Sequence, residues 1–453
     1  MKEFWAANAW VDGRWQRDVR LSVGADGCWQ SIAANATADG AQVLRGPVIP
    51  SLVDTHSHAF QRAFAGLAER REGADDFWSW RDRMYGLALK LTPAQLRAIA
   101  AQLYLELLQG GYTQVCEFHY LQHQPDGSAY DDPLAMSWAL ADAAADAGIG
   151  LTVLPVLYAR SGFGQPGLRA DQRRFATDAD GVWQASQRIN AAGRPLLNAG
   201  VALHSLRAAN SEDIRALQQR VGDTDLPIHI HIAEQQQEIN DCLAATGQRP
   251  MAWLSEQFRP DARWHLVHAT HSTPAEIAQV AASGASVVIC PSTEGNLGDG
   301  LIDLPGWLAA DVPLSIGSDS QIGRAWGEEL RWLEYGQRLG LRRRNVAADP
   351  PTQPSTAARL FEVVRAGSAA PAGFKRWGLQ VGARADFLVL DANASGLRGL
   401  PVEQLIDGLI FASAGNALRD VFVSGTPVVV DGQSARQTQI GAEFESVMRG
   451  LWS

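Results

Sequence analysis

The middle of the chain alternates between short apolar runs and longer segments with helical periodicity. Eight runs have the composition of buried strands, at residues 47–56, 112–120, 150–158, 195–205, 226–234, 263–270, 285–293 and 312–320. These runs are nearly continuous in apolar character, which is typical of parallel strands covered on both faces. Eight such strands separated by helices favour a closed (β/α)8 barrel, as in TIM-like enzymes, over an open doubly wound sheet.

The spacers between these runs carry helix boundary signals. Segments 92–111 and 132–148 are helix candidates that each end in glycine, and Thr273-Pro274 followed by Glu276 is typical of a helix N-terminus. The chain has neither a GxGxxG after its first strand nor a GxxxxGK[ST] motif. The usual sequence signatures of dinucleotide and P-loop nucleotide sites are therefore missing.

The two ends of the chain differ from the middle in having short alternating stretches. Dipeptides typical of hairpin turns lie at Asp12-Gly13, Asp26-Gly27, Ser424-Gly425 and Asp431-Gly432. Neither end alone supplies enough strands for a stable sheet, so we expect the two to pair. The predicted organisation is a small β-sandwich domain from residues 1–47 and 366–453, with the barrel spanning residues 48–365.

The amino-acid composition and net charge indicate which kinds of binding partner the chain could have. The chain has 453 residues, of which 46% are apolar and 19% charged, so a large core is expected and extensive disorder is not. The formal net charge is −10, which argues against a nucleic-acid partner because phosphate-binding surfaces need an excess of positive charge. A small anionic substrate stays compatible, since a few arginines can reverse the field inside one pocket.

Cysteine usage and hydropathy bear on the compartment. The four cysteines are widely spaced, without a CxxC pair, which favours a reducing compartment. The first residues carry charges and tryptophans where a signal peptide needs an apolar stretch. No apolar run approaches the ~20 residues that span a bilayer. We therefore expect a cytoplasmic protein without a membrane partner.

All ten histidines lie between positions 56 and 271, and several fall where a predicted strand ends. His56 and His58 are two residues apart on the first strand, so both side chains point to one face, ~6.6 Å apart along the strand. Imidazole nitrogen is a preferred ligand of Zn2+. Taken alone, this HxH pair is equally compatible with a structural role.

Further polar residues end three other predicted strands. The fifth strand carries His231 with Glu234 three residues later, the sixth ends with His268, and the eighth ends with Asp319. The carboxyl ends of the strands form the face on which barrel enzymes place their chemistry. We therefore expect these four residues to meet the HxH pair.

The combined pattern resembles the amidohydrolase superfamily, and so does the split β domain. The resemblance implies that His56, His58, His231 and Asp319 hold the metal, while His268 orients the attacking water. The fourth predicted strand has no lysine of the kind that bridges two metals in other members, which favours one metal. We expect one Zn2+ per chain, although the same ligands accept other divalent ions.

The H-x-x-E spacing resembles the deaminating branch of that superfamily. In this interpretation Asp319 accepts a proton from the attacking water, and Glu234 passes a proton to the departing nitrogen so that it leaves as ammonia. His268 holds the nucleophile as it forms. The catalytic residues are thus predicted to be Glu234, His268 and Asp319.

Local segments across the whole chain are similar to the formiminoglutamate deiminases of bacterial histidine degradation. Such segments include HSHAFQRAFAGLAER (56–70), FWSWRDRMY (77–85) and HIHIAEQQQEI (229–239). The resemblance implies hydrolysis of N-formimino-L-glutamate to N-formyl-L-glutamate and ammonia, and it hints at a homodimer. The implied substrate-binding residues are Gln61, Arg81, Tyr120, His204 and Arg207. Two arginines suit the two carboxylates of this substrate, with Arg83 as a rival for the role of Arg81.

Two other functions remain open at this stage. A deaminase or chlorohydrolase acting on a nucleobase-like ring would use the same metal ligands but predicts a flat apolar pocket instead of paired arginines. A catalytically silent barrel that serves as a scaffold would usually have lost at least one ligand, whereas this chain keeps all of them.

Overall fold

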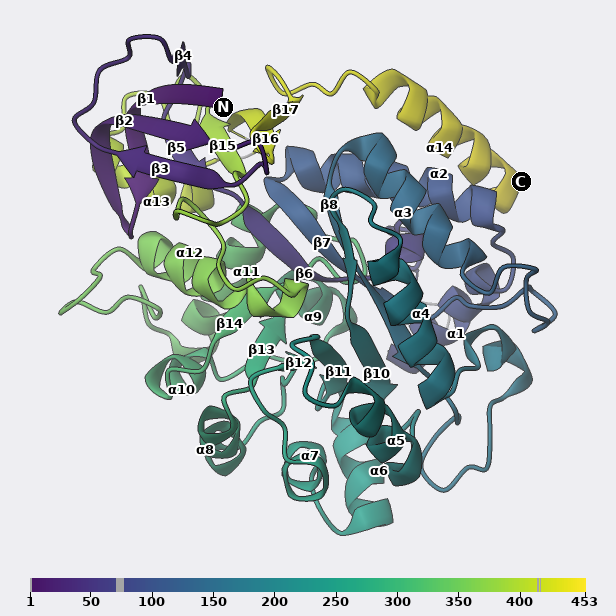
Figure 1. Ribbon diagram of the computed structural model, residues 1–453. Helices are drawn as coiled ribbons and strands as arrows, with labels where there is room; N and C mark the ends of the chain where they lie inside the picture. The colour runs from purple at the N-terminus through teal and green to yellow at the C-terminus, as the bar shows by residue number, and fades with distance from the viewer. Residues whose placement is uncertain (1, 71–76, 414, 416) are drawn as a thin grey trace.

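The central part of the chain forms a parallel barrel (Figure 1). The structure is a computed structural model that describes residues 2–70, 77–413, 415 and 417–453. The barrel strands, in chain order, are β6 (Leu52–Ser57), β7 (Tyr112–His119), β8 (Gly150–Leu157), β9 (Leu197–Ala199), β10 (Val201–Ser205), β11 (Ile228–Ile232), β12 (Trp264–His268), β13 (Ser286–Ile289) and β14 (Leu314–Ile316). Each neighbouring pair is parallel, which confirms the predicted (β/α)8 class.

The first and last barrel strands meet just beyond their regular hydrogen bonding. Ser57 and Asp319 form a parallel bridge there. The backbone N–H of Asp319 donates to the carbonyl of His56 at 2.9 Å, and the N–H of His58 donates to the carbonyl of Asp319 at 3.2 Å. The barrel is therefore closed by the same residues that were predicted to bind metal.

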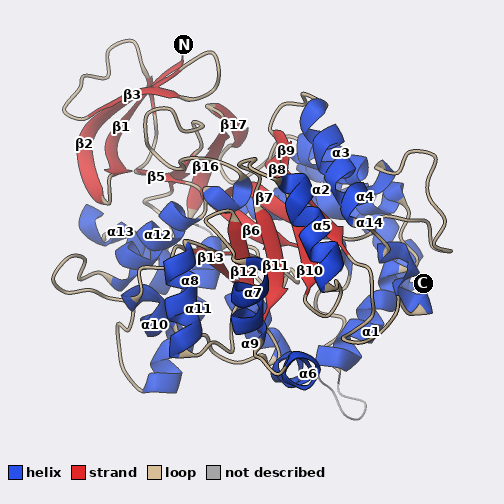
Figure 2. Ribbon diagram, turned by 60° about the horizontal axis from the view of Figure 1, so that its bottom comes forward, coloured by secondary structure: helices blue, strands red, loops and turns tan. Residues whose placement is uncertain are grey.

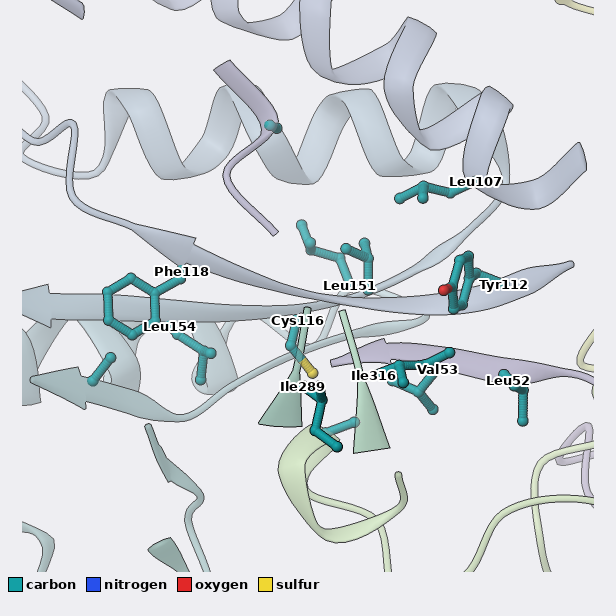
Figure 3. Packing of buried hydrophobic residues seen from close by; sticks show 14 of the residues in the cluster. Leu52, Val53, Leu107, Tyr112, Cys116, Phe118, Leu151, Leu154, Ile289 and Ile316 are labelled. Atoms are coloured by element: carbon teal, nitrogen blue, oxygen red, sulfur yellow. The ribbon is translucent and has the colours of Figure 1, made fainter. Parts of the chain in front are cut away.

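Most barrel strands are buried along their whole length, as their continuous apolar runs predicted; in β9, only Ala199 is buried, and in β10 only His204 is partly exposed. All eight residues of β7 and all eight of β8 are buried. Figure 3 shows Cys116 and Phe118 of β7 beside Leu154 of β8, with Ile289 and Ile316 from β13 and β14 close by. Buried side chains from several barrel strands thus pack together in one hydrophobic core.

Helices surround the strands (Figure 2). They are α1 (Phe77–Ala88), α2 (Pro93–Gln109), α3 (Ala135–Ala147), α4 (Ala179–Ala191), α5 (Ser211–Val221), α6 (Gln236–Thr246), α7 (Pro250–Phe258), α8 (Pro274–Ser283), α9 (Pro291–Leu297), α10 (Leu304–Ala309), α11 (Trp326–Leu341), α12 (Thr356–Gly367), α13 (Leu405–Phe411) and α14 (Gln437–Trp452). The predicted start of α8 is confirmed, since Thr273 and Glu276 form a reciprocal capping box. Gly148 ends α3 in a left-handed conformation with φ of 88°.

A second sheet contains strands from both ends of the chain, as expected. Its members are β1 (Lys2–Val11), β2 (Arg14–Val23), β3 (Trp29–Ala33), β4 (Gln42–Val43), β5 (Val48–Pro50), β15 (Phe387–Leu390), β16 (Leu418–Val423) and β17 (Thr426–Val429). The ends join where β5 pairs with both β1 and the antiparallel β15. Phe4, Phe387 and Phe422 pack against one another in its own small core.

The first predicted apolar run serves both sheets. Its beginning forms β5 of this second sheet, which we call the end sheet because both chain ends contribute to it. Its remainder forms β6 of the barrel, with Ser51 between them. The proposed domain boundaries after residues 47 and 365 stay a prediction. The segment beyond 366 also supplies α14, which packs on α2 and brings Trp452 to the barrel, where its Nε1 donates to the carbonyl of Ala63.

Within the described part of the chain, the helices are too short or too polar to cross a lipid bilayer.

Candidate metal centre and active site

The predicted metal ligands meet at the carboxyl end of the barrel. His56 and His58 lie on β6, His231 on β11, and Asp319 follows β14. Each of these residues is at most 7% exposed. Because the strands are parallel, their ends lie on one face of the barrel, and residues more than 250 positions apart in sequence become neighbours.

The side-chain atoms of these residues converge on one small volume. The Nε2 atoms of His56 and His58 each lie 3.4 Å from Oδ1 of Asp319, and Nε2 of His231 lies 2.9 Å from Nε2 of His56. Two sets of ligand atoms, His56–His58–His231 and His56–His268–Asp319, each lie within 4.8 Å of one another. This geometry brings together all the predicted ligands.

Backbone carbonyls fix the orientation of two of the imidazoles. Nδ1 of His58 donates to the carbonyl of Phe118 at 3.0 Å, and Nδ1 of His231 donates to the carbonyl of His204 at 3.0 Å. A carbonyl can only accept, so in the neutral rings the lone pair is on Nε2, which faces the cluster. The donor set of three imidazoles and a carboxylate therefore fits a divalent cation such as Zn2+.

The protonation states of the cluster residues also favour metal binding. Burial lowers the pKa of His56 to about 3 and lowers that of His58 as well, so both rings are neutral. Burial alone would raise the pKa of Asp319, but the interaction with His56 and the positive charge of nearby His268 lower it below its ordinary value. Neutral imidazole and ionised carboxylate are the forms that bind metals.

His268 lies among carboxylates beside this cluster. Its Nε2 is 3.7 Å from Oε1 of Glu234, and its Nδ1 is 3.4 Å from Oε1 of Glu294. Burial would lower the pKa of His268, but Glu234, Glu294 and Asp319 outweigh it and raise the pKa to about 10. For Glu234, in contrast, burial raises the pKa to about 7, which suits a group that exchanges protons near neutral pH.

Glu294 was missed by the sequence reasoning. It lies in the first turn of α9, just after β13, where an acidic residue is also expected as a favourable partner of the helix dipole. Its Oε1 accepts the N–H of Cys290 at 3.0 Å as well as contacting His268. Its place directly after a barrel strand is the one signal that pointed to the site.

The backbone at the site adopts conformations that side chains other than glycine rarely take. The φ angles of Ala233, His268 and Asp319 are 54°, 72° and 48°. Each of these residues follows or ends a barrel strand. Such conformations cost on the order of 1–3 kcal/mol and cluster at functional sites, because the surrounding structure must enforce them.

A pocket lies over the cluster and contains all five predicted substrate-binding residues. Gln61 comes from the short 3-10 helix η1 (Ala59–Ala63), Arg81 from α1, Tyr120 from the end of β7, His204 from β10, and Arg207 from the turn after it. The sequence reasoning missed the largely apolar part of the wall, which consists of Phe77, Trp80, Met84, Tyr85 and Leu297. No periodicity distinguished these residues from ordinary core positions.

Two arginines give the pocket a positive character. Among the described residues, the buried Nε atoms of Arg81 and Arg207 have no hydrogen-bond partner, and neither has Oε1 of Gln61. Arg83, the rival of Arg81, is exposed and donates to the carbonyl of Arg70 at 3.4 Å. Buried donors without partners are costly, so this pocket is suited to an anionic ligand.

Comparison with known proteins agrees with the fold and with the pattern of residues. The chain is 45% identical to a formimidoylglutamate deiminase from Pseudomonas aeruginosa, over the full length of both chains. It is 26% identical to a 5-methylthioadenosine/S-adenosylhomocysteine deaminase from Halobacterium salinarum, with 88% of this chain and 84% of the relative covered. The crystal structure of an amidohydrolase from Brucella melitensis superposes over both whole chains with 38% identity and a TM-score of 0.94.

The match to a family model covers most of the chain. The model described as the amidohydrolase family matches residues 48–428, which include the whole barrel and most of the end sheet's C-terminal strands. This range contains every residue of the metal cluster and of the pocket over it. The chain therefore belongs to the amidohydrolase family.

Proposed function

We propose that this protein hydrolyses the formimino group of N-formimino-L-glutamate (formimidoylglutamate) to give N-formyl-L-glutamate and ammonia. The observation that carries the proposal is the placement of two buried, unpartnered arginine Nε atoms in the pocket directly over a His/Asp metal cluster. The full-length similarity to a formimidoylglutamate deiminase supports the same substrate. A nucleobase-like ring offers no pair of carboxylates for these arginines.

The metal is proposed to be one Zn2+ per chain, held by His56, His58, His231 and Asp319. The neutral imidazoles and the ionised carboxylate support this assignment. When bound, a divalent cation of this kind lowers the pKa of water and supplies a nucleophile at neutral pH. Fe2+ accepts the same ligands, so elemental analysis of the purified protein identifies the native metal.

The substrate tail is proposed to lie against Arg81 and Arg207. A guanidinium binds a carboxylate through two parallel N–H donors, so each arginine can hold one carboxylate of the glutamate moiety. Gln61 donates through Nε2 to the hydroxyl of Tyr120 at 3.3 Å, which leaves the buried Oε1 of Gln61 to accept from the substrate. His204 and Tyr120 complete the polar wall of the pocket.

The reaction needs two proton transfers, for which the chain supplies three residues. Asp319 accepts a proton from the attacking water, and His268 orients that water beside the formimino carbon. Glu234 faces the amidinium nitrogen and stabilises its charge as a carboxylate. It then takes up the second proton of the attacking water and passes it to that nitrogen, so that the C–N bond breaks with loss of ammonia. The pKa of Glu234, near 7, lets this carboxyl group both hold and release a proton at neutral pH.

An ammonia-release assay tests the proposal. Purified protein is expected to release ammonia from N-formimino-L-glutamate, but not from guanine or formamide, and to lose activity on chelation and regain it with Zn2+. Release from guanine in preference to formiminoglutamate would instead favour the ring deaminase. Absence of release from every substrate by metal-loaded protein would favour the silent scaffold.

Assembly and compartment belong to the same proposal. Trp332, Leu339 and Leu341 of α11 are 52%, 79% and 46% exposed, which supports a homodimer formed through this helix. The four cysteines are all free thiols, which supports a cytoplasmic location. Light scattering on the purified protein measures the oligomeric state directly.

A further inference from the structure

Trp78 contacts both arginines of the pocket. The guanidinium carbon of Arg81 is 4.5 Å from the centre of the Trp78 ring, and that of Arg207 is 5.4 Å from the same ring. Trp78 and Arg81 are three residues apart on α1, whereas Arg207 comes from the turn after β10. A single indole thus contacts two cations supplied by different parts of the fold.

This arrangement offsets an electrostatic cost. Two guanidinium groups in one buried pocket repel each other, and the face of an indole carries the negative part of the ring quadrupole. Glu238 and Glu234 add negative charge near Arg207, and they keep its pKa raised even though burial alone would lower it. The ring therefore holds the two positive groups near each other without occupying the N–H edges that bind carboxylates.

The other aromatic contact of Arg81 cannot play the same part. Tyr85 lies 5.4 Å from the guanidinium carbon of Arg81, but among the described residues its other cation–π contact is with Arg169 and not with Arg207. Arg207 and Arg81 share only Trp78 among the cation–π contacts of the described residues. Trp78 is therefore the aromatic ring that both guanidinium groups contact.

We propose that Trp78 is a specificity-determining residue that sets the separation of the two carboxylate sites. This inference rests on the proposed function. The carboxylates of a glutamate moiety are separated by one more methylene than those of an aspartate moiety, so a fixed arginine spacing selects one chain length. Loss of the ring lets the arginines shift, and the preference for the longer substrate falls.

The test compares Trp78→Leu and Trp78→Phe with the wild type, on N-formimino-L-glutamate and N-formimino-L-aspartate. For Trp78→Leu we expect KM for the glutamate substrate to rise about tenfold, with kcat and the aspartate KM within about twofold of wild type. Trp78→Phe keeps a smaller aromatic face and is expected to lose less. Trp253→Leu is the matched control, since Trp253 is a half-buried tryptophan of α7 that packs on Phe258.

A purely structural role would lower kcat/KM for both substrates by the same factor, and that result overturns the proposal. Calorimetric titration with glutarate and succinate provides a readout without turnover. The wild type should prefer glutarate, and Trp78→Leu should lose that preference while Trp253→Leu keeps it. If the wild type binds glutarate selectively but releases no ammonia, the proposed reaction is wrong. The proposal that Trp78 sets the separation of the carboxylate sites would still stand.

Discussion

At the scale of single residues, Asp319 is the point on which the site converges. One of its oxygens lies 3.4 Å from the Nε2 atoms of both His56 and His58, and the other lies 3.9 Å from Nε2 of His268. Its backbone closes the barrel against His56. Because the same residue fixes both the backbone and the ligand geometry, its carboxylate has little freedom to move away from the cluster.

The proton-transfer role of Glu234 predicts a selective loss of turnover. Glu234→Gln keeps the shape of the side chain but cannot exchange a proton, so kcat should fall by about 10²–10⁴-fold with little change in KM. Steady-state ammonia release measures both constants. Glu403→Gln, at an exposed glutamate far from the pocket, is the control and should behave as wild type. Turnover by Glu234→Gln at the wild-type rate would remove Glu234 from the reaction.

The carboxylate-binding role of Arg207 predicts that its replacement changes KM more than kcat. Arg207→Ala removes a charge-assisted contact worth about 1.5–3 kcal/mol, so KM should rise about 10–100-fold while kcat changes much less. Arg215→Ala, at an exposed arginine of α5, is the matched control. An unchanged KM for Arg207→Ala would show that another group binds the substrate carboxylate.

Which site residues could be predicted from the sequence follows from their spacing. His56 and His58 could be found because alternate residues of a strand share a face, and His231, His268 and Asp319 because they end strands of the same parallel barrel. Glu294 could not be distinguished from an acidic residue that stabilises a helix N-terminus. Trp78 could not be distinguished from a packing residue, because its role depends on Arg207, which is distant in sequence.

At the scale of elements, α2 fixes two loops that carry site residues. Glu106 of α2 accepts from Nε of Arg62, next to Gln61, at 2.7 Å and lies 2.8 Å from Nε of Arg324, which follows Asp319 by five residues. Burial alone would raise the pKa of Glu106, but the hydrogen bond and charge of Arg62 and the charge of Arg324 lower it below its ordinary value of 4.5. This carboxylate therefore stabilises the fold in its ionised form.

Replacing Glu106 should produce a pH-dependent loss of stability. A pKa that is lower in the folded than in the unfolded state gives stability that is present above about 4.5 and is lost as the pH falls below it. Glu106→Gln should thus reduce the free energy of unfolding by about 1–3 kcal/mol at pH 7, and the difference from wild type should shrink below pH 4.5. Urea unfolding at several pH values measures it; a difference that stays constant to pH 3.5 would contradict this account.

The elements themselves could largely be predicted from apolar runs and capping residues. Thr273 and Glu276 marked the start of α8, and Asp12-Gly13 marked the turn between β1 and β2. The division of the first run into β5 and β6 could not be predicted, because both parts are fully buried and only Ser51 lies between them. The pairing of Val48–Pro50 with β1 and β15, which are both distant in the sequence, places that part in the end sheet.

At the scale of the whole molecule, a metal at the cluster would connect β6, β11 and the segment after β14. A ligand that binds only the folded state stabilises it by about 2.7 kcal/mol at a hundredfold excess over its Kd. Chelation should therefore lower the thermal midpoint of the protein by about 3 °C or more, and Zn2+ should restore it. Differential scanning calorimetry with parallel metal analysis measures the effect.

His56→Ala serves as the control for this stability experiment. This variant lacks one proposed ligand, so its thermal midpoint should respond much less to chelator and to added Zn2+. An equal response of wild type and variant would place the bound metal elsewhere in the molecule.

The bridge between Ser57 and Asp319 also bears on how the protein is made. During synthesis, the N-terminal half of the reaction centre leaves the ribosome more than 250 residues before its last member, so a truncated chain that stops short of position 319 has no competent centre. The catalytic site is therefore complete only after the final barrel strand has been synthesised and has docked against the first. Premature termination then yields inert fragments rather than partly active, uncontrolled hydrolases.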